Sequence, residues 1–546
     1  MNIIIFGFSQ YTHDLYWSYL NDKTKFNKIV IVDLQSSKDE IVTLTAHSNV
    51  TCDTYFLDDD IKHMRQLPSD VYQTLQNIVT NEHITHAIIA TEPRSHDIYI
   101  DFCLNMNLHI LCDTPLTLPM YTNTPVGASS IIENYEKIIK KWQSQTDTLF
   151  ELSSLERAHK GYQYVYEIIE NIVKTYQVPI HKIHVSSTKN NLVNPNDMIL
   201  QESQPYKYGY GHLMHEGHHL IDLLTFFANI NKKYGFIERR KAYRVSDYRP
   251  NDFYRYYGKL LNQSIHGLSN DKIYDNLNIL KYFGEFELHT AIDYMDESEH
   301  KIMTGTIDLS HSSHTQEIIE ISIGPLITVK IINDTDHHYF DIHIYRNSQF
   351  IDGKPFEIIK LEQTQDHFLT QTTHFDLLDD FFLYKQSHTN ILDHQEEIEI
   401  LTHIHQEMAQ KLDMSQFRFA VELIIEHNGK ILVCRRRPDV KIAPGVWNVP
   451  AGKVQYNESM DAAIIREAKE ETNLDISDFS CLGYQFINKA HQRCVYTYHV
   501  HVDDISNLII DTGEFDQYDW IDASNVDNYD SLNPHIRDAI IQLTHV

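Results

Sequence analysis

Three glutamates in the C-terminal part of the chain have the residue type and spacing that can hold a divalent cation. Glu467, Glu470 and Glu471 stand at positions i, i+3 and i+4, so a helix from Ser459 to Thr472 places them on one face. Three like charges on one face repel one another, and a divalent cation among them removes that repulsion. The alternative is a solvated acidic helix face, which is common for a charged run of this kind.

The sequence before these glutamates favours the metal site. WNVPAG ends at Gly452, five residues separate Gly452 from Glu458, and seven more lead to Arg466. This stretch closely resembles the Nudix box, GX5EX7REUXEEXGU with U aliphatic. It departs from the box at Asn473, where the pattern has glycine. Asparagine tolerates a left-handed conformation better than other non-glycine residues, so we expect that conformation at Asn473.

The resemblance implies an enzyme that uses Mg²⁺ (or Mn²⁺) to hydrolyse a nucleoside diphosphate linked to another group. A diphosphate is anionic and repels a nucleophile, so metal ions must neutralise it while a carboxylate activates water. Glu467 and Glu471 are the implied catalytic carboxylates, with Glu467 the candidate general base, and Arg466 orients a neighbouring carboxylate. Glu514 lies in a later loop, where it is either a further metal ligand or an ordinary loop glutamate without a role in catalysis. The implied metal ligands are the Ala451 carbonyl and the carboxylates of Glu467, Glu470, Glu471 and Glu514.

Composition and charge restrict the partners. The chain has 546 residues, 42% hydrophobic and 22% charged, which suits a globular protein of roughly three domains. The formal net charge of −30 argues against nucleic acid and an anionic membrane as partners. Six cysteines without paired spacing indicate free thiols, and the chain shows neither a basic leader nor a run of about 18 apolar residues. We therefore expect a cytoplasmic protein that binds a small-molecule nucleotide.

Short apolar strands alternate with helical patterns over residues 1 to about 150, which predicts a doubly wound parallel sheet. The first turn begins with Gly7, but Ser9 and Thr12 stand where a dinucleotide-binding turn has further glycines. Asp33 ends the second strand, where it either accepts ribose hydroxyls or caps a turn. The expected strands are Ile3 to Phe6, Ile29 to Val32, His86 to Ala90 and His109 to Cys112.

Three later segments, IATEPRSH from Ile89, ILCDTPL from Ile110 and HEGHHLID from His215, resemble segments of the Gfo/Idh/MocA oxidoreductases. The resemblance extends to about residue 412. It implies a Rossmann-like dinucleotide-binding domain (1–150) and an α+β substrate domain with a mostly antiparallel sheet (151–412), before the Nudix domain (413–546). It also implies NAD(P) as cofactor and is compatible with a homo-oligomer, because sheet-mediated dimers are common in that family. The implied cofactor-binding residues are Gly7, Ser9, Asp33, Thr91, Pro93, His96, Asp113, Thr114 and Pro115.

The departures from that family concern proton transfer. Thr114 stands where the family has lysine and His215 where it has aspartate, while His219 is kept. A threonine hydroxyl does not titrate near neutral pH, whereas His215 and His219 can act as acid and base. The N-terminal region is therefore either an NAD(P)-dependent oxidoreductase or an inactive dinucleotide or sugar-nucleotide sensor that regulates the hydrolase.

The segment from His215 to His219 also matches HExxH, the zinc-protease signature. Gly211 and Gly217 weaken a helix at this place, and no HxxGxxH extension follows. The oxidoreductase alignment accounts for more of the segment, so we favour it over a zinc site.

The rest of the chain completes the predicted organisation. Beyond Gly235, strands with period-two alternation predominate, for example Tyr339 to Tyr345. The predicted linker is Asp413 to Gln416, which breaks the preceding helix. Asn428 and Gly429 then join two strand-like runs in a predicted hairpin, because both tolerate positive φ. The α/β/α sandwich implied by the Nudix resemblance closes with a helix near His535 to Leu543.

Overall fold

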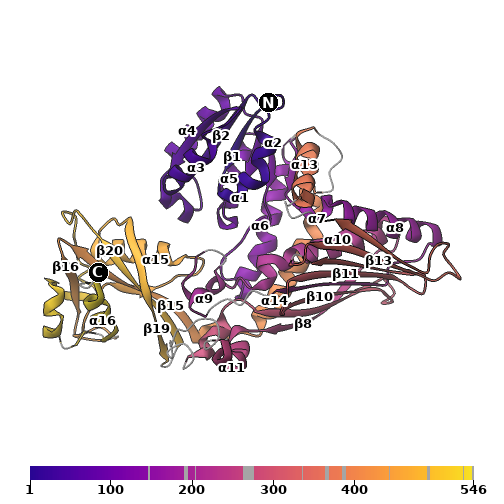
Figure 1. Ribbon diagram of the computed structural model, residues 1–546. Coiled ribbons are helices and arrows are strands. Elements are labelled where there is room, and N and C mark those ends of the chain that lie inside the picture. The colour runs from indigo at the N-terminus through magenta and orange to yellow at the C-terminus, as the bar shows by residue number, and fades with distance from the viewer. Residues whose placement is uncertain are drawn as a thin grey trace. The chain divides into compact units, whose positions relative to one another are not determined.

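The computed structural model describes residues 1–543 except 146–147, 190–194, 203–204, 262–275, 335, 363–367, 384–388, 442, 489–491, 530 and 533. The chain divides into two compact units (Figure 1). The first contains Met1–Asn194, Tyr208–Pro250 and Phe283–Lys411, and the second contains Pro195–Lys207, Asn251–Tyr282 and Leu412–Val546. Within the described ranges, no helix is both long and apolar enough to span a bilayer. The domain limits at residues 150 and 412 stay a prediction.

The first unit begins with a parallel six-stranded sheet of order β3-β2-β1-β4-β5-β6. Its central strands are continuous apolar runs, because a parallel sheet covered on both faces buries every side chain. The predicted Rossmann-like sheet is thus confirmed. The strands are β1 (Asn2–Phe6), β2 (Lys28–Leu34), β3 (Thr51–Leu57), β4 (His86–Ile89), β5 (His109–Cys112) and β6 (Phe150–Leu152). The helices are α1 (Gln10–Thr12), the π-helix η1 (His13–Trp17), α2 (Ser18–Leu20), α3 (Lys38–Thr45), α4 (Ser69–Asn81), α5 (His96–Asn105) and α6 (Pro125–Gln143).

The same unit contains an eight-stranded sheet of order β14-β13-β12-β11-β7-β10-β9-β8. Strands β7 and β10 pair in parallel and the other described neighbours are antiparallel, as the sequence pattern predicts. The strands are β7 (Lys182–Lys189), β8 (Arg240–Tyr248), β9 (Glu287–Met295), β10 (Lys301–His311), β11 (Gln316–Ile323), β12 (Ile327–Asp334), β13 (Tyr339–Arg346) and β14 (Phe356–Glu362).

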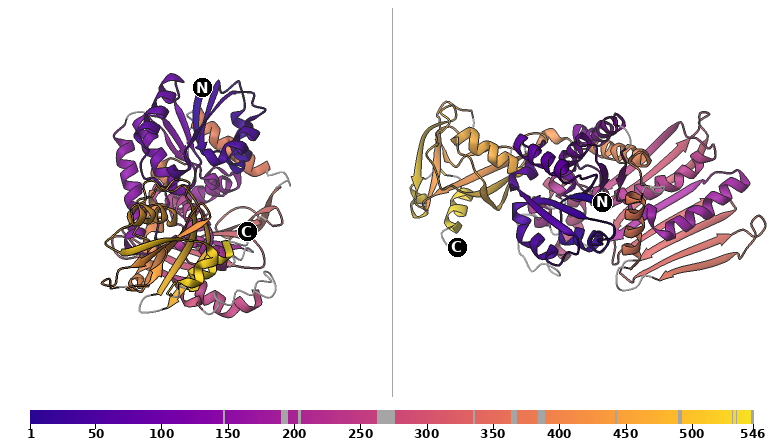
Figure 2. Two further views of the ribbon diagram at one scale, coloured as in Figure 1. Left: turned by 90° about the vertical axis from the view of Figure 1, so that its left-hand side faces the viewer. Right: turned by 90° about the horizontal axis from the view of Figure 1, so that it is seen from above.

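Helices cover one face of this sheet. Helices α8 (Lys160–Tyr176) and α10 (His218–Lys233) run along it (Figures 1 and 2), and α10 packs on β7 and β10. In β13, Phe340, Ile342 and Ile344 are buried and the residues between them are less so, which is the expected alternation. The sheet thus has one apolar face under helices and one more polar face.

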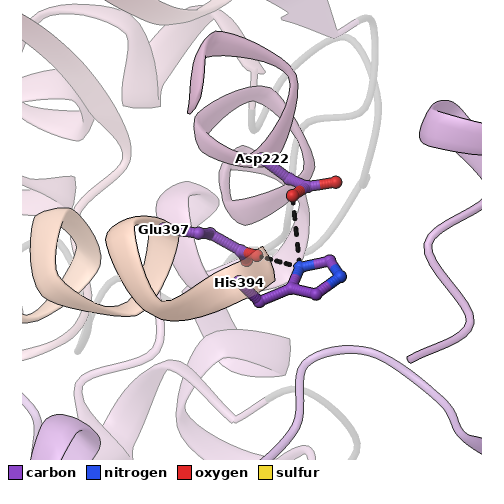
Figure 3. A group of neighbouring side chains, drawn as sticks. All are labelled: Asp222, His394 and Glu397. Carbon is purple, nitrogen blue, oxygen red and sulfur yellow. Dashed lines mark hydrogen bonds and ion pairs between the residues drawn. The ribbon is translucent and has the colours of Figure 1, made fainter. Parts of the chain in front are cut away.

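A buried ionic cluster joins α10 to the start of α14 (Gln395–Gln410) (Figure 3), and α7 (Leu155–Ala158) adds Arg157 to it. Nδ1 of His394 lies 3.2 Å from Oδ1 of Asp222 and 2.7 Å from Oε2 of Glu397. Nε of Arg157 donates to Asp222 over 2.8 Å, and the Ser154 hydroxyl donates to it over 2.6 Å. All three groups of the Asp222–His394–Glu397 set can ligate a metal, but the Arg157 guanidinium already occupies Asp222. We interpret the cluster as a charge-compensated structural link.

The charges of this cluster balance. Burial raises the pKa of Asp222, but Arg157 and His394 together outweigh it and hold that pKa well below its usual range. Burial and the charge of Arg157 lower the pKa of His394, but Asp222 and Glu397 outweigh them and raise it to about 9. Two cations therefore face two acids in a site where an uncompensated charge is costly.

The second unit contains a seven-stranded mixed sheet with the path β17-β16-β15-β20-β19, and with β18 on β15 and β21 on β16. Asn428 and Gly429, both at positive φ (50° and 76°), join β15 to β16 as the predicted hairpin turn. Helix α15 (Met460–Thr472) packs on β15 and β18, and α16 (Pro534–Leu543) contributes to a core with β16 and β21. The strands are β15 (Phe417–His427), β16 (Lys430–Arg436), β17 (Trp447–Asn448), β18 (Ala451–Lys453), β19 (Asp478–Asn488), β20 (Gln492–His501) and β21 (Phe515–Ile521).

Two segments from the middle of the chain also belong to the second unit. Helix α9 (Pro195–Leu200) lies against β19 and β20: Tyr496 donates to the Ile199 carbonyl over 2.8 Å and Tyr484 donates to Asn196 over 2.6 Å. The ring of Tyr282 stacks on Phe417, with centroids 4.6 Å apart. A chain cut at residue 412 therefore removes part of this unit's packing.

We expect the Arg157→Met variant to lose about 3–5 kcal/mol of unfolding free energy, because Asp222 keeps a buried charge without its strongest partner. Urea unfolding followed by circular dichroism measures the loss. Arg240→Met is the control, since Arg240 pairs with Glu299 at the surface with side chains 51% and 61% exposed, and we expect no measurable change. Equal stability of the two variants would contradict the structural role of the cluster.

Candidate functional site

The loop before α15 is fixed to the helix by a contact that requires glycine. A Cβ atom at Gly452 would collide with the carboxylate of Glu467, so this carboxylate lies directly against the backbone of β18. Ser459 caps the helix by accepting from the Ala462 N–H over 3.1 Å. At the other end, Asn473 has φ 58° and ψ 13°, which confirms the predicted left-handed conformation. Asparagine in place of the box glycine at position 473 therefore leaves the end of α15 intact.

Glu471 is a buried acid that forms no ion pair with a lysine or arginine among the described residues. Its side chain is 5% exposed, and Oε2 accepts from the Ala451 N–H over 2.9 Å. Burial raises the pKa of Glu471 to about 8; the Ala451 N–H lowers it, the nearby Glu514 and Glu467 carboxylates raise it again, and the charge of Arg436 lowers it. Glu514 and Glu467 thus lie near enough to act on Glu471, but the three carboxylates do not meet as a ready three-ligand cluster among the described residues.

Arg466 binds the remaining carboxylates of the box. It donates to both oxygens of Glu458, over 2.6 and 2.9 Å, and to the Lys453 carbonyl over 2.9 Å. Its Nη1 also donates to Glu467 over 2.6 Å and to Glu470 over 2.9 Å. The arginine therefore connects the loop, the buried Glu467 and the exposed Glu470, whose side chain is 58% exposed.

The geometry gives the predicted metal ligands different roles. Glu467 and Glu471 are buried beside Gly452 and Ala451, and burial raises the pKa of Glu467 while Arg466 lowers it and Glu470 raises it. Glu514, 44% exposed and paired with Arg436 over 3.0 Å, approaches from the loop before β21. The two buried carboxylates, Glu467 and Glu471, have raised pKa values and suit a divalent cation, which takes oxygen ligands. The residues present therefore fit the metal that the box implies.

The predicted cofactor-binding residues of the first turn have structural partners. Gly7 has φ 85°, and a Cβ there would lie 2.6 Å from the Ala90 carbonyl oxygen, so this close approach requires glycine. The Asp33 carboxylate accepts from the backbone N–H of Phe8 over 2.6 Å and thereby holds the turn. Ser9 caps α1. Both side chains support the turn rather than project freely from it.

The other predicted cofactor-binding residues lie at the carboxyl ends of β4 and β5. His96 is fully buried and bridges the Thr91 and Leu116 carbonyls, 2.9 and 3.1 Å away. Asp113 accepts from the Tyr16 hydroxyl over 2.6 Å, and burial raises its pKa to about 6. Pro93 begins the 3₁₀ turn η4 (Pro93–Ser95), and the Thr114–Pro115 peptide bond is cis. These residues gather beside Gly7, where the strand order of the sheet changes direction and such sheets bind ligands.

His219 has an acidic partner that the sequence did not indicate. Its Nδ1 lies 3.4 Å from the Glu156 carboxylate. Burial lowers the pKa of His219, but Glu156 outweighs it and raises that pKa to about 9. Glu216 pairs with Lys189, and His215 lies in the π-helix η6 (Leu213–Gly217), so the HExxH residues form no three-ligand cluster among the described residues.

Three residues that contact the predicted site residues or their neighbours were missed by the sequence analysis. Glu156, Lys189 and Tyr16 lie in segments far from the family-like motifs, and no local spacing marks them. Two features of the sequence could have indicated these residues. Lys189 is a polar residue at the end of an alternating strand, and Tyr16 carries a hydroxyl inside an apolar helix.

Known proteins resemble separate parts of this chain. Nucleoside triphosphatase NudI from Klebsiella pneumoniae (strain 342) is 26% identical over 129 residues, which cover 22% of this chain and 91% of that protein. CTP pyrophosphohydrolase from Escherichia coli is 40% identical over 55 residues, 10% of this chain and 40% of that protein. The solved myo-inositol 2-dehydrogenase from Lactobacillus plantarum is 14% identical with TM-score 0.47, over 75% of this chain and 97% of that one.

Two family models match the ends of the chain. Residues 416–543 match the NUDIX domain, and residues 1–137 match the oxidoreductase family with an NAD-binding Rossmann fold. The first match contains the glutamates described above, and the second contains the Gly7 turn and the ends of β4 and β5. The chain therefore joins an N-terminal Rossmann domain of the Gfo/Idh/MocA oxidoreductase family to a C-terminal Nudix domain.

Proposed function

We propose that the C-terminal part hydrolyses a diphosphate bond of a nucleotide with Mg²⁺ or Mn²⁺, and that the N-terminal part binds NAD(P). The observation that supports the first proposal is the buried pair Glu467 and Glu471 beside Gly452 and Ala451, where Glu471 forms no ion pair with another described residue. Two of the similar proteins, a nucleoside triphosphatase and a CTP pyrophosphohydrolase, are named for nucleotide substrates, which is consistent with a nucleotide substrate here.

The side chains have distinct tasks in this proposal. Glu467, Glu471 and Glu514 would hold the cation, with the Ala451 carbonyl and the more exposed Glu470 as further oxygen ligands. A cation held there would supply charge neutralisation of the diphosphate and a lowered pKa of water. Glu467 accepts the proton of the attacking water, and Arg466 keeps Glu467 oriented. Glu458 in turn fixes Arg466 through two hydrogen bonds.

The N-terminal part supports dinucleotide binding more directly than hydride transfer. The Gly7 turn and the ends of β4 and β5 are in place, but Thr114 offers no titrating group at the position where the family has lysine. His219, held by Glu156, is the group that can exchange a proton there. The alternative is an inactive sensor that regulates the hydrolase. Both alternatives predict dinucleotide binding, but only the oxidoreductase also predicts turnover of the bound cofactor.

We expect Glu471→Gln to lower the Mg²⁺-dependent hydrolysis of nucleotides by about 100-fold or more, because the amide is a poor ligand for the cation. Release of phosphate or pyrophosphate from a panel of nucleoside triphosphates measures the rate. Asp475→Asn is the control, since Asp475 follows the same helix with its side chain 79% exposed. An unchanged rate in Glu471→Gln would contradict the assigned role.

We expect Mg²⁺ to raise the melting temperature of the protein more at pH 8 than at pH 6. The pKa of Glu471 is raised from 4.5 to about 8, so the metal-free folded state binds this proton more tightly than the unfolded state and loses stability as pH rises through that window. The cation replaces the proton and restores the loss. Differential scanning fluorimetry of the wild type and Glu471→Gln tests this, and an equal Mg²⁺ effect in both proteins argues against it.

We expect the full-length protein to bind NADH or NADPH, with at least about tenfold weaker binding in Gly7→Val. The valine collides with the Ala90 carbonyl and cannot adopt φ 85° without strain. Quenching of nicotinamide fluorescence measures binding. Gly235→Val is the control, because it has the same left-handed strain (φ 89°) but open space at Cβ. Equal affinities of the wild type and Gly7→Val for the dinucleotide would contradict the binding site at Gly7. Oxidation of polyols by bound NAD(P)⁺ would distinguish an oxidoreductase from a sensor.

A further inference from the structure

A second buried acid of the Nudix unit lies one strand away from the proposed metal site. Glu422 on β15 is the strand partner of Ala451, the residue whose N–H donates to Glu471. Neighbouring strands lie about 4.8 Å apart. A nucleotide whose diphosphate is held at Glu471 can therefore bring its other end near Glu422.

Glu422 forms a polar cradle with residues of β19, β20 and α16. Its Oε2 accepts from the amide of Gln485 over 3.2 Å and from the hydroxyl of Thr497 over 3.4 Å. Nε2 of His535 lies 3.0 Å from the same hydroxyl. The second carboxylate oxygen, Oε1, has no hydrogen-bond partner in the part of the chain that the structure describes.

In the described part of the chain, the Glu422 carboxyl group lacks the ion pair that a buried structural acid normally has. Its side chain is 7% exposed and no arginine or lysine pairs with it among the described residues, in contrast to Asp222, which binds Arg157. An acid buried without a cation costs stability, and such groups occur preferentially at ligand sites.

There is room for a ligand beside the cradle. Gly483 on β19 is the strand partner of Thr497, and a Cβ built at Gly483 would meet no atom within 4 Å. The face of the sheet next to Thr497 and Gln485 is therefore open at this point.

The chemistry of the cradle selects a base with N–H groups on its edge. Carboxylate Oε1 accepts a hydrogen bond, and the Gln485 side chain, whose Nε2 donates to Glu422, carries an amide oxygen as a second acceptor. Guanine presents a ring N–H next to an exocyclic NH₂, whereas uracil presents one N–H between two carbonyls. We propose that Glu422, with Gln485, binds the N–H edge of a guanine base in the nucleotide whose diphosphate is cleaved at Glu467 and Glu471, an inference that rests on the proposed function.

The test compares GTP, ITP and UTP as substrates of the full-length protein with Mg²⁺. Inosine lacks the exocyclic NH₂, so we expect the wild type to prefer GTP over ITP and UTP in kcat/KM by about tenfold or more. Glu422→Gln keeps the shape but presents a neutral side chain. We expect it to lower kcat/KM for GTP by about 10–100-fold through KM, and to change UTP hydrolysis little.

The control is Glu426→Gln on the same strand, since Glu426 pairs with His499 over 2.8 Å and takes no part in the proposed cradle or metal site. The kcat/KM values of Glu426→Gln for GTP, ITP and UTP should equal those of the wild type. Melting temperatures verify folding, and Glu422→Gln should melt at or above the wild type because it removes a buried acid. Equal losses of Glu422→Gln on all three nucleotides, or no loss, would overturn the base-recognition proposal and leave the hydrolase intact. No hydrolysis of any nucleotide by the wild type would overturn the proposed function itself.

Discussion

The Glu467 carboxylate lies against the backbone of Gly452, and the geometry of the proposed hydrolase depends on this contact. It fixes the loop before α15 to the helix that follows, because no side chain fits between them. The Ala451 N–H then fixes Glu471, one helical turn further on. Arg466 holds the other side of the loop through Glu458. Two buried acids are thereby held in place before any substrate or ion arrives, which is the preorganisation that electrostatic catalysis requires.

Buried acids occur in this protein in two chemically different settings. Asp222 is surrounded by Arg157, His394 and Ser154, so its charge is compensated and it serves the packing of helices. Glu471 and Glu422 form no ion pair with a lysine or arginine among the described residues, and burial raises the pKa of both. This contrast is the physical ground for proposing ligand sites at Glu471 and Glu422, since a bound ligand can relieve the cost of an uncompensated buried acid.

The elements with strong local signals were predictable from the sequence. The apolar runs of β1, β2, β4 and β5 predicted the parallel sheet, and the Asn428-Gly429 turn and the left-handed Asn473 followed from backbone sterics. The edge strand β3 and the three-residue strand β6 were not predicted, because their sequences, TCDTYFL and FEL, lack a continuous apolar run.

The candidate sites were harder to predict than the fold. Helical spacing placed Glu467, Glu470 and Glu471 on one face, but it did not show that Glu470 lies at the solvent edge of that face, because this depends on how α15 packs on β15. The pairing of Glu156 with His219 and of Glu422 with Thr497 joins residues 63 and 75 positions apart. Such contacts follow from sheet register and helix packing, which a single sequence does not specify.

The location of a bound cation tests the central claim most directly. Crystals of the full-length protein soaked in Mn²⁺ and measured at the manganese absorption edge reveal the ion by its anomalous scattering. The account predicts an anomalous peak within ligand distance of Glu467 and Glu471 in the wild type, and its loss in Glu471→Gln. A peak at Asp222, His394 and Glu397 instead, or no peak beside Glu467 at saturating Mn²⁺, would contradict it.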